Sequence, residues 1–258
     1  MSGDDAAAMN SAPVLRCHEV SKRYGRTQAL DRVSLAVAAG EMVALLGPNG
    51  AGKSTLFQLL TGLFVADSGS VEVLGADMRR EPVRALSRLG VVFQQPALDL
   101  NLSVRASLRF HADLHGLPGA VSRPRIEALL ARFGLADLAR KPGRELSGGN
   151  RRKVELVRAL IHEPRLLLMD EATVGLDPGS RAQLLEDVLQ ARSEHGLGVL
   201  WATHLVDEAE RAQRVIVLHK GHVLWDGEAR ALCAQEGVPT LQGAFLKLTG
   251  GQKNAMAA

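Results

Sequence analysis

The sequence predicts an α/β fold with a central parallel sheet, an antiparallel β flap before it and a helical subdomain inserted within it. Short aliphatic runs alternate with helical patterns, which is typical of strands buried on both faces of a parallel sheet. The strand pattern disappears between residues 96 and 144, where amphipathic helices are expected instead. The aliphatic runs are residues 42–46, 89–93, 166–169, 199–202 and 215–218.

Length and composition describe a chain that can bury a large core. It has 258 residues, of which 46% are hydrophobic, and no apolar run approaches the roughly 18 residues of a membrane span. With a net charge of +3, one Tyr and two Trp, we expect no nucleic-acid partner. Cys17 and Cys233 lie far apart and suit reduced packing residues better than a disulfide. Residues 1–13 lack the pattern of an export signal, so we expect a disordered N-terminus and a cytoplasmic protein.

The flap is expected just before the first buried strand. Residues 33–37 alternate between apolar and polar side chains and end at Ala39-Gly40, which is typical of an antiparallel strand with one face in water.

Residues 47–54 read Gly-Pro-Asn-Gly-Ala-Gly-Lys-Ser and lie between a strand pattern and a helical pattern. In such a loop the glycines leave backbone N–H groups free to bind phosphates, Lys53 adds a positive charge and the Ser54 hydroxyl binds Mg²⁺. Composition alone would produce this motif in roughly 0.6% of such chains. The sequence therefore predicts a phosphate-loop NTPase core, whose next helix begins near Lys53 and turns inward Leu56, Leu59, Leu60 and Leu63.

Two carboxylates, Asp170 and Glu171, directly follow the apolar run 166–169. A buried strand that ends in two acids can deliver one to Mg²⁺ and the other to an attacking water. We predict that Asp170 holds the metal ion through water and that Glu171 orients or deprotonates the water for hydrolysis.

A second anion-binding helix start is predicted at residues 145–150, Glu-Leu-Ser-Gly-Gly-Asn. The Ser147 hydroxyl and two glycines would expose several donors at the N-terminus of a helix whose inner face carries Val154, Val157 and Ile161. An ordinary N-cap role for Ser147 is an equally good interpretation of this segment alone.

Helices are also expected at residues 103–115 and from Ser122 to Phe133-Gly134. His111 and His115 have the i, i+4 spacing of metal ligands. Because no further ligand lies near them in sequence, we expect a solvated helix face rather than a metal site. After Gly227 we expect one or two short helices, and a tail at residues 250–258.

Six segments together carry a family resemblance: the loop at 47–54, Gln94 after Val-Val-Phe, Leu-Ser-Gly-Gly-Asn at 146–150, Met-Asp-Glu at 169–171, Gly-Leu-Asp at 175–177, and Thr203-His204. In order and spacing they resemble the nucleotide-binding subunit of ATP-binding cassette (ABC) transporters over about residues 14–230. The resemblance implies one cassette domain at 14–249, with the helical subdomain at about 96–162.

The resemblance also implies two ATP molecules, each with Mg²⁺, held between two subunits in a head-to-tail homodimer or pseudo-dimer. Gln94 would reach Mg²⁺ and the attacking water, and His204, which follows the buried strand pattern at residues 199–203, would hold the γ-phosphate. Glu171, His204 and Gln94 would be catalytic, and Ser54, Gln94 and Asp170 would hold the metal ion. The implied nucleotide contacts are Tyr24, Gly47, Pro48, Asn49, Gly50, Ala51, Gly52, Lys53, Ser54, Thr55, Ser147, Gly148, Gly149 and Asp177.

In this set Tyr24 would stack on adenine, and Asp177 would contact the other subunit. The residues alone leave open a core position for Tyr24, and Gln95 in place of Gln94. Two positions depart from the family pattern: Asn150 replaces the usual Gln, and Ala172 replaces the Pro that usually follows the catalytic acid. We expect Asn150 to alter the strength of ATP binding and Ala172 to loosen the turn, since Pro would have fixed one backbone angle.

The predicted function is an ATPase subunit that powers a separate permease from the cytoplasmic face of the membrane. By family analogy the permease would contact the helical subdomain near residues 94–101. Residues 90–104 resemble exporter cassettes more than importer cassettes, and residues 148–152 and 200–208 resemble a subgroup linked to pyrroloquinoline-quinone-dependent alcohol oxidation. The alternative is a cassette ATPase acting on a protein assembly without a permease. A kinase or GTPase is disfavoured because the chain has no Asn-Lys-x-Asp guanine motif and because such enzymes have no use for residues 146–150.

Overall fold

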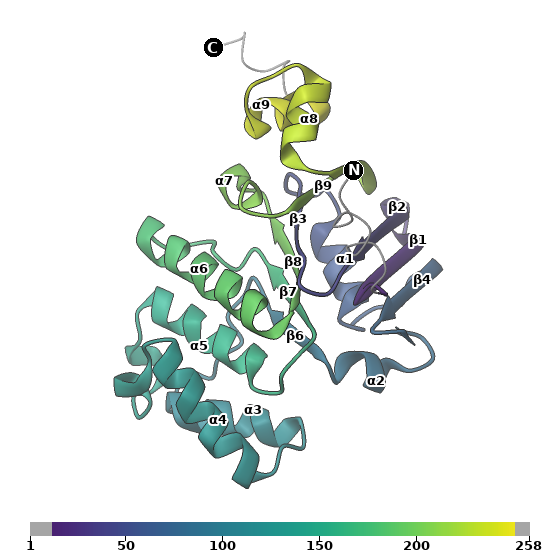
Figure 1. The fold of residues 1–258 in the computed structure, drawn as a ribbon. Coiled ribbons are helices and arrows are strands. Elements are labelled where there is room, and N and C mark those ends of the chain that lie inside the picture. Colours follow the sequence, from purple (N-terminus) through teal and green to yellow (C-terminus); the bar gives the residue numbers. More distant parts are fainter. Residues whose placement is uncertain (1–11, 251–258) are drawn as a thin grey trace, which may run out of the picture.

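The computed structural model describes residues 12–250, which form two sheets with helices around them (Figure 1). We expected a disordered N-terminus at residues 1–13 and a tail at residues 250–258. Apart from residues 12, 13 and 250, these segments lie outside the described residues. The mixed α/β architecture confirms the predicted fold class.

The larger sheet contains all five predicted buried strands, and they run parallel to one another. Its order is β10-β9-β3-β8-β7-β6, so the strand before the phosphate loop lies inside the sheet between β8 and β9. The final strand pairs antiparallel with β9 and was not anticipated from the sequence. The strands are β3 (Met42–Leu46), β6 (Leu89–Val92), β7 (Leu166–Asp170), β8 (Gly198–Thr203), β9 (Arg214–His219) and β10 (His222–Gly227).

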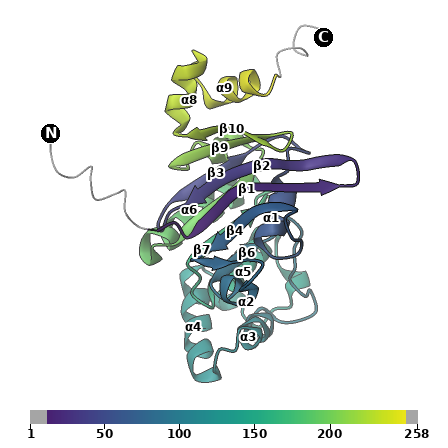
Figure 2. The ribbon, with the colours of Figure 1, turned by 90° about the vertical axis from the view of Figure 1, so that its right-hand side faces the viewer.

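The smaller, antiparallel sheet is the predicted flap, with strand order β2-β1-β4-β5. Its apolar side chains share one buried cluster with the inner face of helix α1 (Lys53–Leu60) and with one face of the parallel sheet. Figure 2 shows the flap strands lying beside α1. The flap strands are β1 (Leu15–Tyr24), β2 (Thr27–Val37), β4 (Ser68–Val73) and β5 (Ala76–Asp77).

The other face of the parallel sheet packs against the helical region and α6, which together form the largest buried cluster. Figure 1 shows α3 and α4 at the end of the molecule farthest from α8 and α9. Val154, Val157 and Ile161 are fully buried, as predicted. The elements are α2 (Pro82–Leu86), α3 (Val104–Leu114), α4 (Gly119–Arg132), the 3₁₀ turns at Ala136–Leu138 and Gly143–Glu145, α5 (Gly148–Leu160) and α6 (Pro178–His195).

Two predicted helix boundaries are wrong. Helix α4 begins at Gly119 rather than at Ser122. The later start was predicted because proline is favoured in the first turn of a helix, but Pro124 lies inside α4. Helix α1 ends at Leu60, and Gly62 follows with a φ of 71°, the left-handed conformation that commonly terminates helices. Leu63 is therefore 65% exposed and does not face the core.

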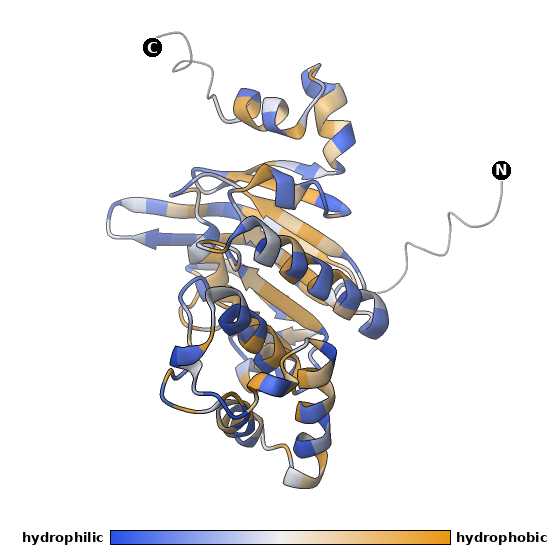
Figure 3. Ribbon diagram, turned by 90° about the vertical axis from the view of Figure 1, so that its left-hand side faces the viewer, coloured by the Kyte–Doolittle hydropathy of each residue, from blue (hydrophilic) through white to orange (hydrophobic). Residues whose placement is uncertain are grey.

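The C-terminal part contains α7 (Val206–Ala209), α8 (Ala229–Glu236) and α9 (Leu241–Leu248), and its apolar side chains form a third cluster against β3 and β9. In Figure 3 the strands of the parallel sheet are mostly orange, whereas the surrounding helices alternate between blue and orange. Among residues 12–250, no helix is both long enough and apolar enough to cross a bilayer.

Candidate nucleotide-binding site

The phosphate loop connects β3 to α1, so the N-terminus of α1 points its free backbone N–H groups at the loop. At two of its glycines, neighbouring backbone atoms leave no room for a side chain. A Cβ on Gly47 would lie 2.5 Å from the Leu218 carbonyl oxygen, and one on Gly52 would lie 2.6 Å from that of Ala29. Gly52 also has a φ of 111°, which favours glycine. The loop can therefore fold tightly against the sheet edge only with glycine at these positions.

Lys53 is the buried cation of this loop, with only 4% of its surface exposed. Its ammonium donates to the carbonyls of Gly47, at 2.7 Å, and Pro48, at 3.2 Å. It also lies 3.1 Å from Oε1 of Glu171. All three contacts are with oxygen atoms, so the ammonium is held at the loop where an anionic ligand would reach it.

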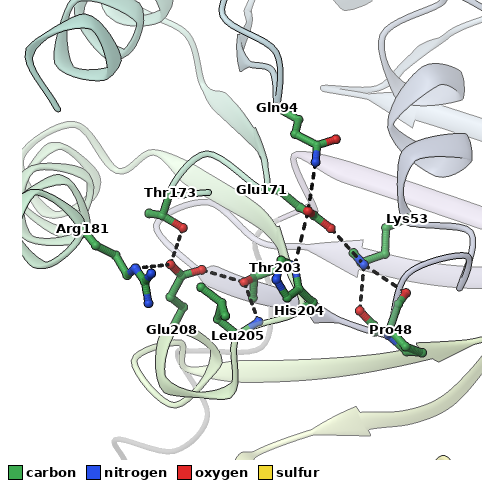
Figure 4. Close-up of polar contacts among 11 residues, drawn as sticks. Pro48, Lys53, Gln94, Glu171, Thr173, Arg181, Thr203, His204, Leu205 and Glu208 are labelled. Atoms are coloured by element: carbon green, nitrogen blue, oxygen red, sulfur yellow. Dashed lines mark hydrogen bonds and ion pairs between the residues drawn. The ribbon is translucent and has the colours of Figure 1, made fainter. Parts of the chain in front are cut away.

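Glu171 is the point at which three other side chains converge (Figure 4). Besides Lys53, Gln94 donates its amide N–H to Oε2 at 3.2 Å, and Nδ1 of His204 lies 3.3 Å from the same oxygen. Gln94 follows β6, Glu171 follows β7 and His204 follows β8, so adjacent parallel strands deliver them to one sheet edge. The structure thus brings Gln94, and not the neighbouring Gln95, to the predicted catalytic acid.

Asp170 ends β7 and is buried, and its Oδ1 has no hydrogen-bond partner within residues 12–250. Burial and the adjacent Glu171 carboxylate raise the pKa of Asp170 to about 6, although Lys53 acts in the opposite direction. A carboxylate in this setting is stabilised by a cation.

A cavity of about 710 Å³ opens over the loop and the carboxylate. Seven of the predicted nucleotide contacts do not line it: Tyr24, Gly47, Pro48, Ser147, Gly148, Gly149 and Asp177. The cavity therefore joins the loop to the predicted catalytic residues but leaves the second predicted anion site apart. The predicted residues that line it are Asn49, Gly50, Ala51, Gly52, Lys53, Ser54, Thr55, Gln94, Glu171 and His204.

Comparison with known proteins agrees with this geometry, since residues 30–174 match the family described as "ABC transporter". The chain belongs to the ATP-binding subunits of ABC transporters. It is 42% identical to the daunorubicin resistance ATP-binding protein DrrA3 of Streptomyces coeruleorubidus over 84% of this chain and 68% of that protein. It is 37% identical to the Nod factor export ATP-binding protein I of Ralstonia nicotianae, over 88% of this chain and 71% of that protein.

A solved structure of cbiO1 from Clostridium perfringens, described as part of the ABC transporter complex cbiONQ, superimposes on the chain with a TM-score of 0.80. It is 31% identical, and the match covers 87% of this chain and 92% of that one. The family assignment makes this ABC subunit an ATPase, as predicted. The subgroup linked to pyrroloquinoline-quinone-dependent oxidation is not confirmed by these comparisons and stays a prediction.

In the ABC subunit, Ser147 and Asp177 are both helix caps. The Ser147 hydroxyl accepts the backbone N–H of Asn150 at 3.3 Å at the start of α5, and Asp177 accepts that of Ser180 at 2.9 Å at the start of α6. A Cβ on Gly149 would lie 2.5 Å from the Ser180 hydroxyl, so packing between these helix starts also requires glycine there. Capping leaves both side chains exposed to solvent.

Tyr24 is 41% exposed, so the core position left open by the sequence is wrong. It lies at the end of β1, edge-on to the ring of Phe64, with centroids 5.9 Å apart. Thr27 and Gln28, which follow it in the flap, line the cavity. Tyr24 is therefore close in sequence to residues that line the cavity, but its own ring does not line it.

Sequence reasoning missed Glu208, a buried carboxylate in α7 that connects the two segments flanking the predicted catalytic residues Glu171 and His204 (Figure 4). It accepts hydrogen bonds from the hydroxyl of Thr173, two residues after Glu171, and from that of Thr203 at 2.6 Å, one residue before His204. Arg181 lies 3.9 Å from its Oε1. The spacing of Thr203 and Glu208 in the sequence does not predict their hydrogen bond, because that contact depends on the turn after β8.

Ala172, one of the two departures from the family pattern, is fully buried after Glu171. Glu171 has a φ of 45°, and its carbonyl accepts the N–H of Val174 at 3.1 Å. Together with the Thr173–Glu208 hydrogen bond, these contacts hold the turn. The expected effect of Ala172 on hydrolysis stays a prediction.

Proposed function

We propose that this ABC subunit binds ATP and Mg²⁺ as one of a head-to-tail pair of chains and powers a permease that exports its substrate. The observation that carries the proposal is the convergence of Lys53, Gln94 and His204 on Glu171 beside the phosphate loop. This arrangement gathers a cation for the phosphates, a carboxylate for the water and two polar side chains to orient them.

In the proposed reaction a water attacks the γ-phosphorus, the bond from that phosphorus to the bridging oxygen breaks, and ADP leaves with that oxygen. Glu171 orients the water and accepts its proton. Binding of the nucleotide replaces the contact between Lys53 and Glu171, so that Lys53 moves to the phosphates and Glu171 is released for the water. His204 then donates to the γ-phosphate.

The residues present fit a magnesium ion, because Asp170 carries a buried carboxylate oxygen with no hydrogen-bond partner in the described chain, and Ser54 lines the cavity. Ser54, Gln94 and Asp170 would hold the ion. When bound, Mg²⁺ would neutralise the charge that develops on the phosphate oxygens.

The second chain is proposed because Ser147, Gly148 and Gly149 begin an exposed helix start that does not line the cavity of their own chain. A helix N-terminus with free N–H groups binds anions. In a head-to-tail pair this helix start would reach the γ-phosphate held by the partner chain, and Asp177 would lie at the same interface.

The permease is proposed to dock on a groove of about 480 Å³ between α3 and the segment after Gln94. Its wall includes Phe110 and Leu114, which are 60% and 67% exposed, together with Leu102 and Asp99. Apolar side chains with a polar rim are typical of a protein-binding surface. A subunit docked there would be peripheral on the cytoplasmic face of the membrane.

Export is favoured by two relatives that are named for daunorubicin resistance and for Nod factor export. The direction can be measured in inverted membrane vesicles, in which an exporter accumulates its substrate when ATP is added outside, whereas an importer does not. A cassette that acts on a non-membrane assembly would cause no transport into such vesicles.

The docking proposal is tested by replacing Phe110 with Asp and fractionating the cells that normally make the protein. We expect Phe110→Asp to release the subunit from membranes, and Val83→Asp, a matched change at an 81% exposed position of α2, to leave it bound. Membrane binding that survives Phe110→Asp would contradict the groove. Recovery of the wild-type chain only in a non-membrane assembly would favour the alternative function.

A further inference from the structure

Three histidines meet between helix α3 and the end of α5, away from the nucleotide cavity. His111 lies on α3, His115 is the residue that follows its C-terminal end, and His162 follows α5 by two residues. No third ligand was expected for His111 and His115, and the expectation of a merely solvated helix face is wrong, because His162 lies directly against His115.

The three side chains lie at the distance of potential metal ligands. One ring nitrogen from each lies within 4.8 Å of the others. The ring of His115 stacks on that of His162 with centroids 3.9 Å apart, and the ring of His111 lies 4.7 Å from His115 and 6.3 Å from His162. In a tetrahedral zinc site the ligand nitrogens are about 3.3 Å apart, given zinc–nitrogen bonds of about 2.0 Å. Side-chain rotation of His111 and His115, which are both half-buried, would have to supply that contraction and unstack His115 from His162.

His162 is prepared for ligation by its surroundings. It is 8% exposed, and its Nε2 lies 3.1 Å from the carbonyl oxygen of Leu89 in β6. Nε2 must carry the proton that this carbonyl accepts, which leaves the lone pair on Nδ1. Nδ1 is buried and has no hydrogen-bond partner among residues 12–250. Metal-binding histidines are typically oriented in this way, with one nitrogen bound to a carbonyl and the other to the metal.

The charges around the cluster come from arginines on several elements. Arg158 of α5 lines the same cavity, and it acts with burial to hold the pKa of His111 at about 3. Burial, with weaker contributions from His115, Arg88 and Arg125, lowers the pKa of His162 to about 4. In its neutral form an imidazole binds transition metals rather than anions. The surrounding guanidinium groups favour an anionic fourth ligand such as hydroxide.

We propose that His111, His115 and His162 bind one Zn²⁺, or a transition-metal ion of the same class, with a fourth ligand position open to the adjoining cavity. That cavity has a volume of about 250 Å³, enough for a water or small anion. Three imidazole ligands and an open position are a known zinc arrangement.

A zinc ion there would connect α3 to the segment that is hydrogen-bonded to edge strand β6. His111 and Arg158 also line the groove proposed for the permease. The ion would therefore fix one wall of that groove, although the metal site itself does not depend on the proposed transport function.

The site is tested by titrating the full nucleotide-free chain with Co²⁺ and then displacing the Co²⁺ with Zn²⁺. We expect one Co²⁺ per chain with the intense visible absorption of four-coordinate cobalt. His115→Gln should weaken binding by more than about 100-fold, since loss of an outer partner alone costs 10- to 100-fold. His18→Gln, an exposed histidine on β1, and His204→Gln should bind as the wild type does.

A second readout is thermal unfolding, because a ligand that binds only the folded state raises its melting temperature. Zn²⁺ at about 100 times its Kd should raise the melting temperature of the wild type by roughly 5 °C or more, and that of His115→Gln by much less. Unaltered Co²⁺ affinity in His111→Gln and His115→Gln, both folded by circular dichroism, would overturn the proposal. So would a wild type that gives only the weak spectrum of six-coordinate cobalt.

Discussion

Helices α1 and α5 both begin at a glycine-rich segment that presents free N–H groups, but their surroundings differ. At α1 the same chain supplies a cavity, a buried lysine and the carboxylate of Glu171. At α5 the Ser147 hydroxyl caps its own helix and faces solvent outside that cavity. Within one chain, only the helix start of α1 is surrounded by the other groups of the proposed nucleotide site, which is why we propose a second chain for the helix start of α5.

The largest expected effect on ATP binding comes from removing the cation at the start of α1. Lys53→Ala should lower ATP affinity by about 100-fold or more, because it deletes the buried cation that would bind the phosphates. Lys141→Ala, at an exposed lysine outside the site, is the matched control. Isothermal titration of ATP would measure both, and an affinity unchanged in Lys53→Ala would refute the role of the loop lysine.

Glu171→Gln separates binding from chemistry at the same site. The amide keeps the size of the side chain and its contact with Gln94 but cannot accept a proton from water. We expect hydrolysis to fall by about 100- to 10,000-fold while ATP affinity is retained. Phosphate release in single-turnover assays measures this change, and normal turnover would show that another group is the base.

Ser147→Arg tests the α5 side of the comparison. We expect it to abolish ATP-dependent dimerisation while ATP binding to the monomer is unchanged, because α5 lies outside the cavity of its own chain. Ser103 gives a matched control, since it caps α3 with the same 3.3 Å hydrogen bond. Dimers of Ser147→Arg that match those of Ser103→Arg in light scattering would contradict the assignment.

Glu208→Gln tests the connection between the segments that carry Glu171 and His204. Loss of the charge weakens the hydrogen bonds from Thr173 and Thr203, so we expect kcat to fall about tenfold with little change in ATP affinity. Asp207→Asn, at the exposed neighbouring acid, is the control. A rise in KM or a fall in melting temperature without a fall in kcat would indicate a merely structural role.

The smallest effect concerns acid stability of the metal-free protein. Burial lowers the pKa of His111 to about 3, well below that of an unfolded histidine, near 6.5. Between these values the unfolded chain binds the proton and the folded chain does not, so stability is lost as the pH falls from about 6.5 toward 3. His111→Gln should flatten this part of the curve in urea titrations with a chelator, and His18→Gln should not.

Much of the fold and of the phosphate site could be predicted, because their signals are contiguous. Residues 42–54 contain a buried strand, a glycine-rich loop and a helix start in one run, and Asp170 and Glu171 directly follow another strand. Glu208 and His162 could not be predicted, since their partners Thr173 and Leu89 lie 35 and 73 positions away and meet them only through the sheet order. The early end of α1 depended on one glycine and was missed for that reason.

Complementation between two inactive variants tests whether each nucleotide site is shared between two chains. Lys53→Ala keeps Ser147, and Ser147→Arg keeps Lys53, so a head-to-tail pair with one chain of each contains one intact nucleotide site and one doubly damaged site. We predict that the mixture hydrolyses ATP well above the sum of the two separate proteins. A mixture no more active than that sum would contradict a site shared between two chains.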